Sequence, residues 1–264
     1  KETICFLRHD IDFSPKNALQ IARLEAKENV TSTFTVLLTG QYYSPFNKNT
    51  KDLLKEIKNY GQEIGLHFDP TCYNIKAEKD LDLYVAKEAE LLSDLLDVDV
   101  SMFSFHNTTD FSESCRSMTY GNLVNAYSNF FHDDVEYTSD SNGYWRFRTW
   151  EELLAEGHKI IQVLTHPVWW QPDNSLPPLE TIIKCCLERY GTDICDYNKI
   201  FNGQNARVNK SALTEYLRKE NKINDTEILN AYSNNSLLIK FLLTKYKSNE
   251  DVDLEEIAIK FLTP

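Results

Sequence analysis

Basic residues are scarce in this 264-residue chain: 28 Lys and Arg stand against 40 Asp and Glu, a formal net charge of −12. Nucleic acids and anionic membrane surfaces bind proteins through Lys and Arg, so neither is expected as a partner. No apolar run reaches the length that crosses a bilayer, and no membrane span is predicted. No amino-terminal signal peptide is recognised either. What is left is a globular protein, and 42% apolar and 12% aromatic residues are enough for its core.

Several catalytic motifs are missing as well. The chain has no G-x-x-x-x-G-K-[ST] loop and no G-x-G-x-x-G turn, so it lacks the glycine-rich loops that hold nucleotide phosphates. It has neither the G-x-S-x-G elbow of a serine hydrolase nor a His-Glu-x-x-His metal motif. A pair of carboxylates would serve a glycosidase, but that interpretation gives the histidines described below no role.

The six cysteines form no C-x-x-C pair and show no spacing typical of a disulfide framework. Cys5 lies in a strand predicted to be buried, and Cys185 and Cys186 are adjacent on a predicted helix. Because thiols stay reduced in the cytoplasm, free cysteines and a cytoplasmic location are predicted.

Strand and helix patterns alternate over the first two thirds of the chain. Strands are predicted at 4–7, 30–39, 62–68, 100–105, 135–140 and 160–165. Helices are predicted at 14–28, 52–60, 77–96, 121–130, 150–156 and 177–190. This alternation indicates parallel strands joined by helical crossovers, and therefore an α/β fold. The pattern alone is compatible with an irregular barrel or with an open sheet.

The character of the sequence changes towards the carboxyl end. Short helices are predicted there at 210–221, 224–232, 235–247 and 253–262. The apolar stripe of Leu237, Leu238, Phe241, Leu242 and Tyr246 is typical of the core of a small helical bundle. Two domains are therefore predicted: a β/α domain at 1–204 and a small α-helical extension at 205–264, through which a homo-oligomer could form.

Polar side chains collect where the predicted strands end. The carboxyl ends of parallel strands share one edge of a sheet, so these groups are expected to converge although they lie far apart in sequence. Imidazole and carboxylate groups together are the ligand set of zinc or a similar divalent metal, with an open position for water. The groups are Asp10, Asp12, His67, Asp69, His106, Asn107, Asp140 and His166.

Three motifs carry a resemblance to a known family. Asp-x-Asp follows the first strand, Gly61-Gln-Glu-Ile-Gly-Leu-His67 ends the third, and Leu164-Thr-His166-Pro ends the last. In this order they resemble the polysaccharide deacetylases, carbohydrate esterase family 4 with the NodB-homology fold, over residues 4–170. The variant Arg8-His-Asp-Ile-Asp12 resembles the WbmS-like branch with its R-H-D-x-D motif, which is associated with bacterial O-antigen gene sets. The fold implied is an irregular (β/α)6-7 barrel of parallel strands.

The chain departs from the family pattern at three places. Where family members have a second metal-binding His, this chain has Thr71, and Ile11 separates two aspartates that are usually adjacent. Ser104-Phe-His106-Asn107 replaces the usual Arg-Pro-Tyr segment. The third metal ligand must therefore come from elsewhere. His106 is the prediction, with Asp69 and His166 as alternatives.

The resemblance implies a metal-dependent hydrolase that removes an N-acetyl or O-acetyl group from a sugar or glycan in bacterial surface-polysaccharide biosynthesis. Zinc would be held by Asp12, His67 and His106. Asp10 would be the general base and His166 the general acid, although the roles of the two aspartates could be exchanged.

Further residues are predicted to bind or orient the substrate. Arg8 or Arg146 would hold Asp10 ionised, and the segment Asp140–Trp145 is similar to the family's Asp…Trp segment near the substrate. The predicted substrate-binding set is Arg8, Asp69, Asn107, Asp140, Trp145, Arg146 and Trp169, with Trp170 as a further stacking residue. Two alternatives stay open: a catalytically degenerate barrel that binds sugar or acts as a scaffold, and a metal amidohydrolase acting on a non-sugar amide.

Overall fold

The structure is a computed structural model that describes residues 3–145, 148–170, 177–186 and 189. The strands are β1 (Ile4–Ile11), β2 (Thr33–Leu37), β3 (Glu63–Phe68), β4 (Met102–Phe105), β5 (Thr119–Tyr120), β6 (Leu123–Asn125), β7 (Glu136–Ser139) and β8 (Ile160–Thr165). The helices are α1 (Pro15–Lys27), α2 (Lys48–Asn59), α3 (Glu78–Leu96), α4 (Asp110–Ser114) and α5 (Trp150–Ala155), with short turns η1 (Pro70–Tyr73), η2 (Phe130–Asp134) and η3 (Ser141–Gly143). Residues 178–186 are also helical.

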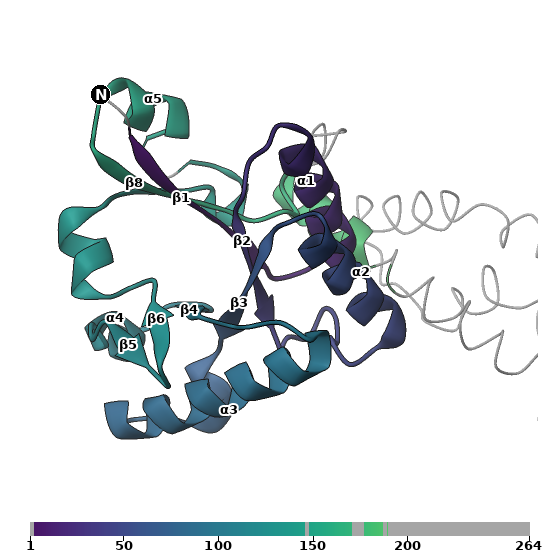
Figure 1. Cartoon of the computed structure of the whole chain (residues 1–264), viewed down its shortest axis with the longest axis vertical. Helices are drawn as coiled ribbons and strands as arrows, with labels where there is room; N and C mark the ends of the chain where they lie inside the picture. Colours follow the sequence, from purple (N-terminus) through teal and green to yellow (C-terminus); the bar gives the residue numbers. More distant parts are fainter. Residues whose placement is uncertain (1–2, 146–147, 171–176, 187–188, 190–264) are drawn as a thin grey trace, which may run out of the picture. The chain divides into compact units, whose positions relative to one another are not determined.

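All eight strands belong to one sheet, in the order β5-β6-β4-β3-β2-β1-β8-β7. Every neighbouring pair is parallel except β5–β6, and β1 lies between β2 and β8. The sheet curls into a half-barrel, with α1, α2 and α3 along the outer side of the curve (Figure 1). Among the described residues β5 and β7 are its two ends and do not pair with each other. The predicted α/β fold with a parallel sheet is confirmed.

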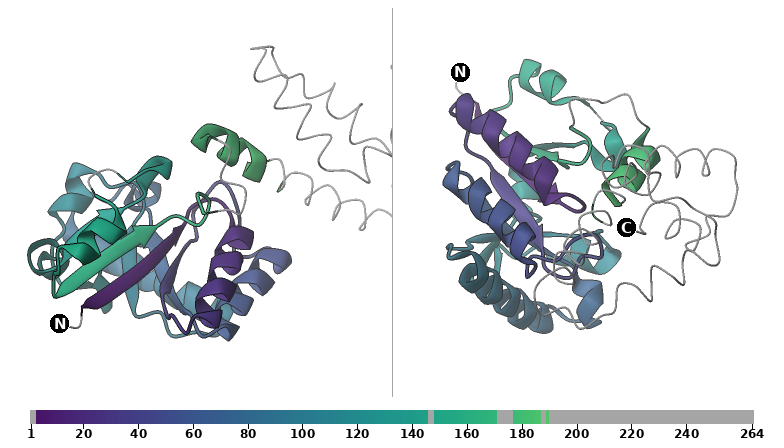
Figure 2. Two further views of the ribbon diagram at one scale, coloured as in Figure 1. Left: turned by 90° about the horizontal axis from the view of Figure 1, so that it is seen from above. Right: turned by 90° about the vertical axis from the view of Figure 1, so that its right-hand side faces the viewer.

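The first strand changes character halfway along. Its amino-terminal half is exposed, with Ile4 at 58% and Phe6 at 40%, whereas its last four residues are buried. Figure 2 shows this strand running beside β8. Cys5 is exposed, so its predicted burial is wrong. Cys5 and His9 point to the same face of the sheet. Helix α1 covers His9, which contacts Glu25 in the last turn of that helix, but α1 does not extend as far as Cys5. The five described cysteines are free, as predicted.

Local capping sets where the helices begin. Ser14 caps α1 by accepting from the Asn17 N–H at 3.3 Å, and Pro15 stands at the first helical position, as predicted. Helix α2 begins at Lys48, four residues before the predicted start at 52, because the Asn47 side chain accepts from the Asn49 N–H at 2.9 Å.

The helix predicted at 121–130 is wrong. Gly121 and Asn122 both have positive φ, 57° and 64°. Two such residues between two strands make the tight turn of a hairpin, here joining β5 to β6 with Tyr120 opposite Leu123. The apolar residues that suggested a helix lie on β6 and on the turn that follows it.

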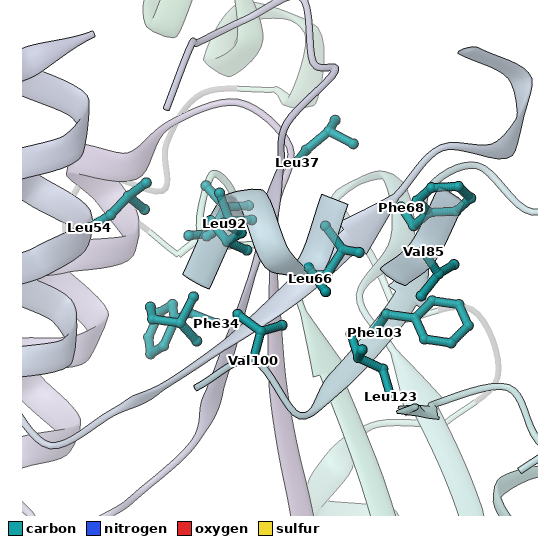
Figure 3. Packing of buried hydrophobic residues seen from close by; sticks show 14 of the residues in the cluster. Phe34, Leu37, Leu54, Leu66, Phe68, Val85, Leu92, Val100, Phe103 and Leu123 are labelled. Carbon is teal, nitrogen blue, oxygen red and sulfur yellow. The ribbon is translucent and has the colours of Figure 1, made fainter. Parts of the chain in front are cut away.

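The main core lies between the outer face of the sheet and its helices. Phe34, Leu66, Phe68 and Phe103 of β2, β3 and β4 are fully buried against α1, α2 and α3 (Figure 3). Burying one such side chain contributes about 1.5–3 kcal/mol. Since the helix-covered face supplies this core, polar groups on the opposite face of the sheet do not disturb it.

Glu88 is a buried carboxyl on the sheet-facing side of α3. It is 3% exposed; its Oε1 accepts a short hydrogen bond from the Tyr73 hydroxyl, and its Oε2 has no hydrogen-bond partner among the described residues. Burial raises the pKa of Glu88 to about 7 from an ordinary 4.5, against the opposing effect of the Tyr73 hydrogen bond. The folded protein therefore holds this proton more tightly than the unfolded chain does.

The free energy of unfolding should accordingly fall as the pH rises from 4.5 to about 7, because Glu88 must ionise inside the folded protein. At about 1.4 kcal/mol per pKa unit, the loss is of the order of 3 kcal/mol. Glu88→Gln should flatten this dependence, whereas Glu90→Gln, on the exposed side of α3, should leave it unchanged. Urea unfolding at a series of pH values measures the difference. Equal pH dependence in wild type and Glu88→Gln would contradict the assignment.

Other predictions fall elsewhere in the chain. Strands β1 to β8 and helices α1 to α5 belong to one compact unit, which ends at Thr181. The predicted boundary at 204/205, the four predicted carboxyl-terminal helices and the oligomer predicted to form through them lie outside the described residues. No helix in the described ranges is long and apolar enough to cross a membrane.

Candidate metal centre and active site

The carboxyl edge of the sheet brings the predicted site residues together. Asp10 and Asp12 lie at the end of β1, His67 near the end of β3, and His106 directly after β4. The backbone N–H of His106 donates to the Phe68 carbonyl at 2.8 Å, which continues the β3–β4 pairing by one residue. Residues separated by nearly a hundred positions thus meet because the strands run parallel.

Three side chains meet closely enough to share one metal ion: Asp12, His67 and His106. His67 Nε2 lies 3.1 Å from Asp12 Oδ1, and His106 Nδ1 lies 3.5 Å from the same oxygen. The two ring nitrogens, His67 Nε2 and His106 Nδ1, are 3.2 Å apart. One carboxylate oxygen and two imidazole nitrogens therefore form a small triangle.

The dimensions of this triangle fit a divalent metal. Bonds of about 2.0–2.2 Å to nitrogen and oxygen place neighbouring ligand atoms about 2.8–3.6 Å apart in tetrahedral or octahedral geometry. All three observed separations fall in this interval. Asp12 Oδ1 is also a buried oxygen with no hydrogen-bond partner among the described residues, since its contact with His67 lacks hydrogen-bond geometry. Burying a carboxylate oxygen without a hydrogen-bond partner lowers the stability of the folded protein unless a cation binds that oxygen.

Neighbouring groups orient both rings. His67 Nδ1 lies 2.7 Å from Ser104 Oγ, and Ser104 in turn donates to Asp10 Oδ1 at 3.3 Å. A proton on His67 Nδ1 leaves the lone pair of Nε2 facing the triangle. His106 Nε2 lies 2.8 Å from the Asn107 amide nitrogen Nδ2. Turning that amide over places its oxygen there instead; His106 is then protonated at Nε2, and its Nδ1 lone pair also faces the triangle.

Asp10 is buried behind the triangle and paired with Arg8. Arg8 Nε lies 3.0 Å from Asp10 Oδ1, and both side chains are almost fully buried, at 3% and 2% exposed. The same oxygen accepts from Thr35 Oγ1 at 2.6 Å. Burial by itself would raise the pKa of Asp10, but the Arg8 guanidinium, helped by His67, holds it below its usual range. Among the described residues, Asp10 Oδ2 accepts one long hydrogen bond, from Arg8 Nη2 at 3.4 Å, and lies 3.9 Å from His67 Nδ1, so a lone pair stays available.

His166 stands across the site, held by Asp140. Asp140 Oδ1 accepts from the backbone N–H of His166 at 3.0 Å and lies 2.7 Å from its Nδ1. Asp140 Oδ2 accepts from the Trp170 indole N–H at 2.6 Å. His166 Nε2 points towards the metal triangle, 3.8 Å from Asp12 Oδ2. Burial alone would lower the pKa of His166, but the hydrogen bond to Asp140 and the charge of Asp12 raise it to about 9.

Aromatic residues close in sequence to the site residues form two groups of rings. Phe13 lies next to Tyr42, with ring centroids 4.4 Å apart, and 6.3 Å from Trp169. Trp145 and Trp170 form a second pair with centroids 6.0 Å apart. The adjacent tryptophans 169 and 170 therefore belong to different aromatic groups. Trp145 also packs against the small hydrophobic cluster of Leu153, Ile161 and Val163. Trp169 Nε1 is buried and has no hydrogen-bond partner among the described residues.

The remaining predicted residues take other positions. Asp69 caps η1 by accepting from the Thr71 N–H and hydroxyl at 2.9 and 2.6 Å, and it is not part of the metal triangle. Arg146 lies outside the described residues. His9, which lies beside Asp10 in sequence, faces the helices, where it contacts Glu25 and Thr165.

Comparison with known proteins gives only distant likenesses. No family model and no curated protein matches the chain. Among solved structures, the catalytic domain of a peptidoglycan N-acetylglucosamine deacetylase from Eubacterium rectale is 17% identical, with a TM-score of 0.44 over 72% of this chain and 86% of that one. A family 4 acetyl xylan esterase from Clostridium thermocellum in complex with a cobalt ion is 20% identical, with a TM-score of 0.37 over 71% and 85%.

A CE4 family pseudoenzyme from Bacillus anthracis is 13% identical, with a TM-score of 0.41. The match covers 72% of this chain and 62% of the pseudoenzyme, so the chain spans less than two thirds of that protein's length. These likenesses assign no family.

Sequence reasoning missed several residues that support the site. Ser104 orients His67, and Thr35 holds Asp10. Ser104 could have been found, because it lies two positions before His106 and alternate residues of a strand share a face. Nothing local marks Thr35, whose partner on β1 is set by the register between strands.

Proposed function

We propose that this chain is a metal-dependent hydrolase that removes an acetyl group from an acetylated sugar. One observation carries the proposal: a triangle of ligand atoms spaced for a divalent metal lies at the same sheet edge as a buried, ion-paired carboxylate and a carboxylate-bound histidine. The order of the motifs along the chain, which resembles that of the polysaccharide deacetylases, supports the same conclusion.

Asp12, His67 and His106 would hold the metal, and their mixed nitrogen and oxygen donor set suits zinc. A divalent metal bound there would polarise the acetyl carbonyl and lower the pKa of water to about 7. His106 takes the place of the family's usual second histidine, where this chain has Thr71.

Asp10 is the proposed general base. Thr35 and Ser104 hold its Oδ1, and Arg8 keeps the carboxylate ionised, so Oδ2 is free to accept a proton from the attacking water. Arg8 is too deeply buried to reach a sugar, and it acts on Asp10 instead. With Asp12 as a proposed metal ligand and Asp10 as the proposed base, the two aspartates keep the roles first predicted for them.

His166 is the proposed general acid. An amine leaves an acetamide poorly unless it is protonated, and the Asp140 carboxylate at His166 Nδ1 favours the protonated imidazole that can supply this proton. Asp140 holds the ring so that its Nε2 faces the centre. Asp140 is thus a positioning residue for His166 rather than a direct substrate contact.

The two groups of aromatic rings are the proposed sugar contacts. Phe13 follows Asp12 in sequence and has Tyr42 and Trp169 as ring neighbours, and Trp170, the ring neighbour of Trp145, donates its indole N–H to Asp140. The Arg-His-Asp-Ile-Asp motif favours a substrate from bacterial surface-polysaccharide biosynthesis, and Asn107 and Arg146 stay proposed contacts.

The proposal predicts release of acetate from N-acetylated or O-acetylated sugars by zinc-loaded protein. Activity should disappear when a chelator removes the metal and return when zinc is restored, because the catalytic water needs the metal. Acetate is measured by a coupled assay on nucleotide-linked sugars, lipid-linked sugars and simple amides. Hydrolysis of simple amides alone would favour an amidohydrolase with a non-sugar substrate. Sugar binding with no turnover on any substrate would favour a degenerate binding protein.

A further inference from the structure

Tyr43 is a buried tyrosine of the loop between β2 and α2, next to but apart from the catalytic groups. Its side chain is 5% exposed, and its hydroxyl makes two hydrogen bonds. The hydroxyl donates to the Ile11 carbonyl at 2.8 Å and accepts from the Leu37 N–H at 2.8 Å. One oxygen atom therefore ties the end of β1 to the end of β2.

The two backbone groups that it joins belong to the strand ends that carry the metal ligands. Ile11 is the residue before Asp12 and the last residue of β1 to pair with β2, opposite Val36. Leu37 is the partner of His67 in the β2–β3 register. The Tyr43 hydroxyl thus links the backbone beside one ligand to the backbone beside another.

The Tyr43 link bears on the metal centre because β1 and β3, whose ends carry Asp12 and His67, are not neighbouring strands. Strand β2 lies between them and contributes no atom to the triangle. Asp12 Oδ1 and His67 Nε2 nevertheless come within 3.1 Å of each other. At Ile11 the pairing of β1 with β2 ends, so the direction in which the chain leaves towards Asp12 depends on what the Ile11 carbonyl binds.

We propose that Tyr43 is a positioning residue of the metal centre, whose hydroxyl fixes the spacing between Asp12 and His67. The proposal rests on the metal centre proposed above and extends it to a residue with no direct contact to the ligand atoms. Removing the hydroxyl leaves the Leu37 N–H and the Ile11 carbonyl without this partner, and the end of β1 is then free to move relative to β2. Ligand bonds tolerate errors of only a few tenths of an ångström, so metal affinity should fall.

Tyr43→Phe tests the proposal by zinc titration of the metal-free protein against a competing chelator, well below its unfolding temperature. We expect zinc affinity to fall about 10–100-fold, the usual effect of losing a group that orients a ligand. Tyr120→Phe is the matched control. Its hydroxyl is also buried and also bridges a backbone N–H, that of Ser117, to an acceptor, Glu78, far from the site. It should lower stability and leave zinc affinity unchanged.

A second measurement, hydrogen exchange of the wild-type protein, tests the role of Tyr43 without a substitution. It serves if Tyr43→Phe does not fold. Coupling between two sites is reciprocal, so if the hydroxyl link favours metal binding, metal binding must stabilise the link. Zinc should slow hydrogen exchange of the Leu37 amide about 10–100-fold. Unchanged exchange on zinc binding, or wild-type zinc affinity in Tyr43→Phe, overturns the proposal. Failure of the wild-type protein to bind zinc would instead overturn the metal centre itself.

Discussion

Replacing His67 with alanine is expected to abolish stoichiometric zinc binding and, with it, all acetyl hydrolysis. His67 supplies the buried corner of the triangle, 3% exposed and within 3.1–3.2 Å of the other two ligand atoms. Without it only two ligands remain, too few for a catalytic zinc site, which normally has three protein ligands. The loss in affinity should exceed the roughly 100-fold typical of a supporting residue. Elemental analysis after desalting measures the bound zinc.

His132→Ala is the control for this prediction. The His132 side chain is exposed and contacts Asp133 at 2.7 Å, away from the strand ends. Its replacement should leave one zinc per chain and full activity. If His67→Ala also kept one tightly bound zinc, the metal would lie somewhere other than the triangle, and both the ligand assignment and the proposed mechanism would fail.

Replacing His166 with alanine should lower turnover without loss of zinc, unlike the replacement of His67. The expected fall in turnover is about 10²–10⁴-fold, the usual contribution of a general acid. His166 Nε2 lies 3.8 Å from Asp12 Oδ2, within reach of a leaving group but outside the triangle. The loss should appear in kcat rather than KM, because the proton is transferred in the transition state. Zinc content and steady-state kinetics of the same preparation separate the two effects.

His158→Ala serves as the control here. His158 contacts Glu156 on the surface, at the opposite end of β8 from His166, and its loss should change neither zinc content nor kcat. Loss of zinc from His166→Ala would make His166 a metal ligand, the alternative that the sequence left open. Unchanged turnover would remove the general acid from the mechanism.

Much of the fold and the convergence of the site follow from local patterns. The six predicted strands are present because each combines β-branched or aromatic residues with a polar group at its end. The parallel arrangement follows from the alternation of strand and helix, and it brings Asp12, His67 and His106 to one edge. His106 could be singled out from the sequence because the usual position of the third ligand holds Thr71.

Other features depend on contacts that no short stretch of sequence records. The Gly121–Asn122 turn was misjudged because the apolar residues after it suit a helix as well as a short strand. The pairing of Tyr43 with Ile11 and Leu37 depends on how a loop folds back over two strand ends. The exposure of Cys5 depends on where α1 ends relative to β1. Each of these is set by tertiary packing rather than by local propensity.

The central claim is that Asp12, His67 and His106 together hold one metal ion, and anomalous X-ray diffraction from crystals of the zinc-loaded protein tests it most directly. We predict one strong peak at the zinc edge, about 2.0–2.2 Å from a carboxylate oxygen of Asp12, from His67 Nε2 and from His106 Nδ1. No peak at this position, or a peak bonded to His166 in place of His106, would contradict it.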